Sequence, residues 1–146
     1  MIDRLKTIVD LEKYPIHNLN SPIIKNLIEK CKKELDEDSC STIPNFILPK
    51  SLETMNLELE KQLDEVYMSK EKINAYLYAK DDTSLPKKHP KRNFMERYNG
   101  YLNSDCFQKN SEMKYLYETE ELLKFVSACL GVSPIYRWAD PLACHA

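Results

Sequence analysis

The chain has 146 residues, and its 21 basic and 23 acidic side chains leave a formal net charge of −2. This length predicts a single domain, and 42% hydrophobic residues are enough to build its core. Proteins that bind nucleic acid by neutralising phosphates need a basic surplus, so the charge argues against such a partner. The two glycines, Gly100 and Gly131, exclude the P-loop, the dinucleotide-binding fingerprint and the Gly-x-Ser-x-Gly elbow, since each needs closely spaced glycines.

The N-terminus and the cysteines predict a soluble, cytoplasmic protein. Asp3 and Arg4 stand where a signal peptide would be apolar. No uncharged run approaches the ~20 apolar residues of a membrane span, so no membrane partner is expected. The five cysteines contain no Cys-x-x-Cys pair, which favours free thiols in a reducing compartment over disulfides or a zinc site.

The first half of the chain predicts two helices and one strand. Residues 1–20 are predicted to form an irregular N-terminal lead without regular secondary structure, interrupted by Pro15. A helix over Pro22–Leu35 follows, with Ser21 as its N-cap and apolar residues at helical spacing. Thr42–Leu48 is rich in β-formers but contains a proline, which predicts an edge strand. A second helix is predicted over Ser51–Tyr67 from its stripe of apolar residues.

The second half predicts strands before and after a third helix. Ile73–Ala79 alternates apolar and polar residues as a half-buried strand does, and the basic, proline-rich segment 81–97 is expected to be a solvated connection. Asn-Gly at 99–100 between two tyrosines predicts a short hairpin. Glu120–Leu130 predicts a helix with Thr119 as cap and Gly131 just beyond its end. The last predicted strand is Pro134–Ala139.

These elements predict an α+β fold, with three main helices packed on a small sheet. Residues 21–133 form its helical portion with short strands. Candidate catalytic groups are few, because none of the three histidines (His17, His89 and His145) begins a His-x-Asp/Glu metal motif. Cys144 and His145 are only neighbours in sequence and make a poor nucleophile–base pair. No catalytic or metal-binding residue is therefore assigned.

An ordered series of segments nevertheless resembles a known family. The segments are Asp10–Pro15, Ile43–Leu48, Ile73–Leu77, Asp81–Pro90, Glu120–Val126 and Ile135–Leu142. In this order they resemble the N-terminal part of the iron(II)/2-oxoglutarate oxygenases that include amino-acid hydroxylases and halogenases. The resemblance implies a jelly-roll (double-stranded β-helix) core, of which residues 134–146 would be the first strand.

The resemblance also implies which functional groups this chain carries. The metal ligands and the arginine for 2-oxoglutarate would follow Ala146, so no cofactor is expected in this chain, and the complete protein would use Fe(II) and 2-oxoglutarate. Asn99 matches a polar substrate-side position, although Gly100 replaces a bulkier residue, and Tyr76 and Arg137 are the other substrate-side candidates.

Two functions remain open at this stage. One is an N-terminal fragment or degenerate relative of such an oxygenase, inactive alone and directed at a small amino-acid-like substrate. The low glycine content agrees with an incomplete barrel. The alternative is a stand-alone small helical binding protein without catalysis. The first reading leaves the Pro134–Ala139 edge exposed, which predicts self-association through that end. Hydroxylation and halogenation are not distinguished.

Overall fold

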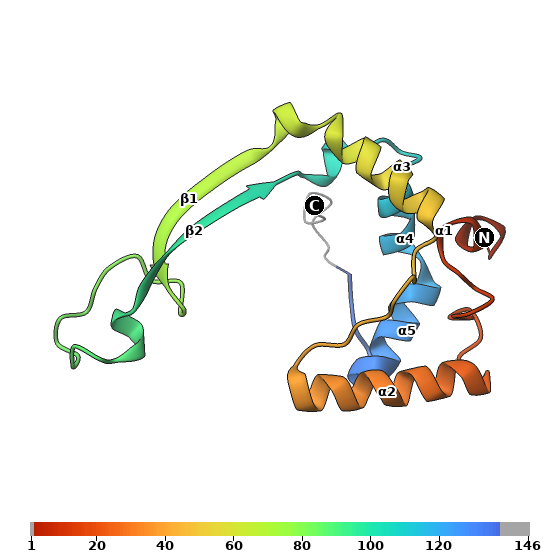
Figure 1. Ribbon diagram of the computed structural model, residues 1–146, viewed down its shortest axis with the longest axis horizontal. Coiled ribbons are helices and arrows are strands. Elements are labelled where there is room, and N and C mark those ends of the chain that lie inside the picture. Colours follow the sequence, from red (N-terminus) through yellow and green to blue (C-terminus); the bar gives the residue numbers. More distant parts are fainter. Residues whose placement is uncertain (1, 138–146) are drawn as a thin grey trace.

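The computed structural model describes residues 2–137, which form a helical body and a projecting two-stranded ribbon (Figure 1). The helices are α1 (Ile2–Ile8), α2 (Pro22–Asp38), α3 (Pro49–Glu60), α4 (Glu112–Glu118) and α5 (Glu120–Leu130). The strands are β1 (Tyr67–Asn74) and β2 (Phe94–Tyr101), and short 3₁₀ turns lie at Leu63–Glu65, Pro90–Arg92 and Ser104–Cys106. Within residues 2–137, no helix is long and apolar enough to cross a membrane.

The core of the body lies where α2 packs against α5 and where α1 packs against α3 and α4. Ile24 and Ile8 are completely buried, and Phe125 is 3% exposed. Phe125 stacks on Phe46 with ring centroids 6.3 Å apart, which joins the segment before α3 to the same core. Each such side chain stabilises the fold by about 1.5–3 kcal/mol when buried, so this cluster accounts for the stability of the body.

Two of the predicted helices are confirmed. α2 begins at Pro22 as expected and continues to Asp38, where Ser39 adopts the left-handed conformation and donates its N–H to the Leu35 carbonyl oxygen. α5 has the predicted bounds, and Gly131 ends it with φ of 65°. Thr119 stands at the predicted cap position, but its hydroxyl donates to the Leu116 carbonyl oxygen and does not cap α5.

The prediction of an irregular lead over residues 1–20 is wrong in its first part, because α1 forms there. Its side chains Leu5 and Ile8 are buried, and this packing stabilises a helix that is too short to show clear periodicity. The predicted edge strand Thr42–Leu48 is reduced to an isolated bridge between Ile47 and Val9. Pro44 lacks the N–H that a longer ladder requires.

The second predicted helix and the strand after it are also shifted. α3 ends at Glu60, and a 3₁₀ turn over Leu63–Glu65 leads directly into β1, so the prediction of helix to Tyr67 is wrong. The stripe of apolar residues continues past Glu60, but Leu63 remains 65% exposed and contributes no helix packing. β1 ends at Asn74, so the predicted strand Ile73–Ala79 shares only Ile73 and Asn74 with it and is wrong beyond them.

The Asn-Gly turn predicted at 99–100 does not form. Asn99 and Gly100 lie inside β2, opposite Ser69 and Met68, and the strands are joined by residues 75–93 instead. Close packing explains the glycine, since a Cβ at Gly100 would lie 2.8 Å from Val66 Cγ1. The Asn-Gly pair that predicts a turn therefore lies at a point of close packing between neighbouring strands.

The α+β class is confirmed, with an antiparallel sheet of two strands in the described part of the chain. The helices pack on one another, and the ribbon projects away from them, so the predicted packing of helices on a sheet is wrong (Figure 1). Of the predicted strand Pro134–Ala139, residues 134–137 are not strand. The remaining two residues lie outside the described residues.

A thiol at the interface between α2 and α5 makes the free energy of unfolding depend on pH in the alkaline range. Burial, together with the neighbouring Cys31, raises the pKa of the Cys129 thiol from 9.0 to about 12. The unfolded thiol ionises near pH 9 and the folded one does not, so the free energy of unfolding should fall as the pH rises from 9 to 12. Denaturant unfolding of the wild type should show this slope, Cys129→Ala should reduce it, and Cys40→Ala, at an exposed thiol, should leave it unchanged.

Candidate functional site

The projecting ribbon is the most exposed part of the described chain. Its strands pair in antiparallel register from Tyr67 opposite Tyr101 to Asn74 opposite Phe94. Eight residues of strand span about 26 Å. Large apolar side chains are exposed along it, namely Tyr67, Met68, Met95 and Tyr98, with exposed fractions of 47–69%. A two-stranded ribbon is marginal alone, and here Tyr67 and Met95 lie on one of its faces and Met68 and Tyr98 on the other.

A hollow of about 480 Å³ lies beside β2 near the far end of this ribbon. Its walls include the apolar side chains Ile73, Leu77 and Met95, and its polar lining includes Arg97 and Asn99. A mostly apolar hollow with a few polar groups is typical of small-molecule sites. Glu96, which forms a 3.8 Å ion pair with Lys70, lines the same hollow.

The polar groups of the hollow are connected along one face of β2. Side chains alternate between the two faces of a strand, so residues 97, 99 and 101 share one face. Arg97 Nη2 donates to the Tyr101 hydroxyl at 2.9 Å. The hydrogen bonds of the Asn99 side chain are satisfied when its amide oxygen faces Arg97 and Tyr101. In this orientation the oxygen accepts from the Tyr101 hydroxyl at 2.8 Å and from Arg97 Nη2 at 2.9 Å. These bonds hold the Arg97 guanidinium in one orientation, and no carboxylate of the described residues forms an ion pair with it.

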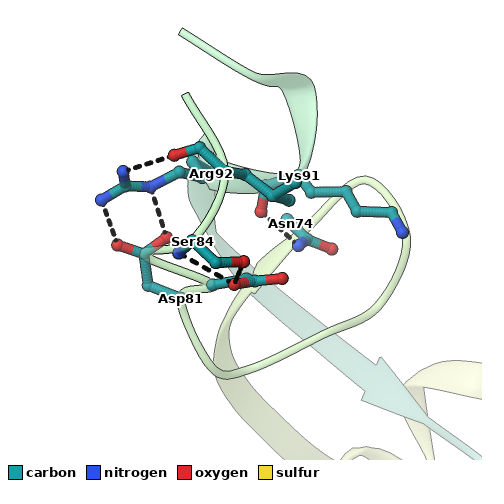
Figure 2. Close-up of polar contacts among 7 residues, drawn as sticks. Asn74, Asp81, Ser84, Lys91 and Arg92 are labelled. Atoms are coloured by element: carbon teal, nitrogen blue, oxygen red, sulfur yellow. Dashed lines mark hydrogen bonds and ion pairs between the residues drawn. The ribbon is translucent and has the colours of Figure 1, made fainter. Parts of the chain in front are cut away.

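The loop at the end of the ribbon is built around Asn74, which is 2% exposed. Figure 2 shows its side chain beneath the backbone of Lys91. Asn74 Nδ2 donates to the Lys91 carbonyl oxygen at 2.6 Å, and Oδ1 accepts from the N–H groups of Tyr76 and Tyr78 at 2.9 and 3.0 Å. This network holds Leu77 at φ of 64°, a backbone conformation unfavourable for leucine.

The rest of the loop is fixed by charged groups (Figure 2). Arg92 Nε and Nη2 donate to the two carboxylate oxygens of Asp81 at 2.9 and 2.8 Å, and this carboxylate raises the pKa of Arg92. Ser84 donates to Asp82 through its hydroxyl and its N–H, which lowers the pKa of that carboxyl. The Asp82 carboxyl is therefore ionised at neutral pH, and Asp81 forms the ion pair with Arg92.

The loop presents aromatic and cationic side chains together. Lys91 Nζ lies 5.7 Å from the ring centroids of both Tyr76 and Tyr78. These rings are 53% and 57% exposed, and Leu77 between them is 68% exposed. Lys87 and two further lysines, Lys80 and Lys88, are also exposed in the loop. The predicted solvated connection 81–97 is thus largely exposed, but residues 94–97 belong to β2.

The three substrate-side candidates lie in three separate places. Asn99 lines the hollow, whereas Tyr76 does not, although its neighbours Ala75 and Leu77 in the loop beyond β1 do. Five strand residues, or about 16 Å, separate Asn74 from the position opposite Asn99. Arg137 lies in the body, where it donates to the Tyr117 carbonyl oxygen at 3.2 Å and to Glu120 at 2.9 Å. Arg97 was not predicted as a site residue. Because residues two apart in a strand share a face, assigning residues 97–99 to a strand would have placed Arg97 beside Asn99.

The described residues do not fit an iron centre. No group of three or more His, Cys, Asp or Glu side chains among residues 2–137 could hold a metal ion. His89 Nδ1 instead accepts a hydrogen bond from the N–H of Lys91. Comparisons with protein-family models, with curated proteins and with solved structures each find no match to this chain.

Proposed function

We propose that this chain is the substrate-side, N-terminal part of an iron(II)/2-oxoglutarate oxygenase that acts on a small amino-acid-like substrate. The hollow beside β2 supports this proposal most directly, because it combines an oriented guanidinium with apolar walls. The ordered resemblance of the sequence supplies the reaction class. Residues 2–137 bring together no group of three or more potential metal ligands, and in this proposal the iron and 2-oxoglutarate are bound by other parts of the enzyme.

The hollow has groups that would hold the carboxylate and the aliphatic side chain of an amino acid. The Arg97 guanidinium would pair with the substrate carboxylate, and such a charge-assisted hydrogen bond is about twice as strong as a neutral one. Ile73 and Met95, which lie on the same face of the ribbon as Arg97, would contact an aliphatic side chain. Asn99 and Tyr101 would act on the substrate indirectly, by keeping Arg97 in place.

Titration of the ¹⁵N-labelled chain with L-leucine tests this binding mode by NMR. We expect shifts at Arg97 and Asn99, and affinity for leucinamide, which lacks the carboxylate, at least about tenfold weaker. Arg97→Gln should weaken leucine binding to a similar extent. Lys25→Gln, which removes an exposed cation from α2, should not. Absence of leucine binding, or equal affinity of wild type and Arg97→Gln, would contradict the proposal.

A metal titration separates the two functions that the sequence leaves open. If the chain is the substrate-side part of an oxygenase, it should bind leucine at Arg97 yet form no stoichiometric complex with Fe(II) and 2-oxoglutarate. A stoichiometric iron complex would refute the assignment of iron binding to other parts of the enzyme. Failure of leucine to bind would favour a binding protein without catalysis, for which the exposed apolar side chains of the ribbon are the supporting observation.

A further inference from the structure

The charges of the chain are divided unequally between the ribbon and the body. Residues 67–101, which form the ribbon and its loop, contain eight basic and four acidic side chains. The remaining residues contain 13 basic and 19 acidic side chains. A basic arm of net charge +4 therefore projects from a chain whose remaining residues carry −6, although the whole chain is almost neutral. Opposite charges at this separation favour association between copies.

We propose that the loop at the end of the ribbon docks on α3 of a second copy of this chain. The loop offers Leu77 as an exposed apolar apex, with Tyr76 and Tyr78 on either side of it. Lys87 and Lys88 are exposed in the same loop. The hydrogen bonds of Asn74 order the apex before binding, which reduces the entropy lost on association.

The receiving surface on α3 is acidic and hollowed. A hollow of about 330 Å³ lies between α3 and the segment before α4, and Leu57 lines it. Leu57 is 49% exposed, and the other residues that line the hollow are polar or charged, Lys61 among them. Glu53 and Glu60 are exposed and stand four residues before and three residues after Leu57, so they share its face of the helix. An apolar apex with Lys91 beside its tyrosines thus faces a largely polar hollow that contains Leu57 and is flanked by the carboxylates of Glu53 and Glu60.

Geometry requires the two surfaces to come from different copies. α3 leads through one short turn into β1, and the loop lies at the opposite end of a ribbon about 26 Å long. Figure 1 shows this loop, in green at the far end of the arm, well away from α3. A copy cannot place its loop on its own α3 without unfolding the ribbon. Two copies related by a two-fold axis can exchange arms, which makes two identical contacts and closes the assembly.

Charge reversal with rescue tests the docking. Sedimentation equilibrium of the wild type should show a dimer that dissociates as salt is raised, because exposed charges are screened. Lys87→Glu combined with Lys88→Glu should weaken the dimer about tenfold or more, since four charge pairs are reversed. Glu53→Lys combined with Glu60→Lys should do the same. The chain carrying all four changes should recover most of the lost affinity.

Two further variants separate docking from general effects of charge and folding. Lys25→Glu combined with Lys124→Glu makes the same change of net charge at exposed lysines of the body and should leave the dimer intact. Leu77→Gly removes the apolar apex at a backbone conformation that glycine prefers, so the loop stays folded while the dimer weakens. A monomeric wild type, or a four-fold variant that associates no better than its parents, would overturn the proposal. Because Leu77 also lines the hollow beside β2, leucine binding is measured separately, on the wild type and Arg97→Gln.

Discussion

Ile24→Ala should destabilise the chain by about 3 kcal/mol, the largest loss that we expect from a single truncation in α2. Ile24 is 0% exposed in the core between α2, α1 and α5. Removal of a buried isoleucine side chain costs about 2–5 kcal/mol, because transfer free energy is lost and a cavity remains. Domains of this size are stable by only about 5–15 kcal/mol, so the loss is a large part of the total. Urea unfolding followed by circular dichroism measures it.

The neighbouring residue provides a matched control. Ile23 is the same residue type in the same helix, but it is 55% exposed. Ile23→Ala should change the free energy of unfolding by about 0.5 kcal/mol or less, as surface substitutions usually do. If the two variants are equally stable, α2 does not pack on the body as described.

The success of this helix assignment and the failure of the ribbon assignment have different physical causes. The face of α2 is set by local spacing, since Ile24, Ile28 and Cys31 recur at helical intervals and are the buried residues. The signal in β1 and β2 is weaker, because neither face of the ribbon is consistently buried. Alternation between apolar and polar residues arises only where one face of a strand packs on a core.

The connection between the strands was equally hard to predict. Asn-Gly is the strongest short hairpin signal in a sequence, and here it lies within a strand. The true connection depends on Asn74, whose amide bonds to backbone groups up to 17 residues away. No local pattern indicates such contacts. The same limit applies to the candidate site, where Asn99 was identified and its partner Arg97 was not.

Asn74→Ala should open the loop at the end of the ribbon while leaving the helical body folded. The variant loses three hydrogen bonds, from Asn74 to the Lys91 carbonyl oxygen and from the N–H groups of Tyr76 and Tyr78 to Asn74. At about 1 kcal/mol each, the ordered loop becomes less stable by about 3 kcal/mol. The unfavourable φ of Leu77 adds to the tendency to open. Amide exchange at Tyr76 and Tyr78 should therefore accelerate about a hundredfold, with little change in α2 or α5.

Two substitutions show whether the individual hydrogen bonds are responsible. Asn74→Asp keeps the oxygen that accepts from Tyr76 and Tyr78 but loses the donor to Lys91, so exchange should accelerate only about tenfold. Asn93→Ala, at an exposed asparagine beside β2, should leave exchange in the loop unchanged. Equal exchange in the wild type and Asn74→Ala would mean that Asn74 does not order the loop. The apex would then lack the preorganisation on which docking to a second copy depends, so this exchange measurement also tests the structural premise of the arm.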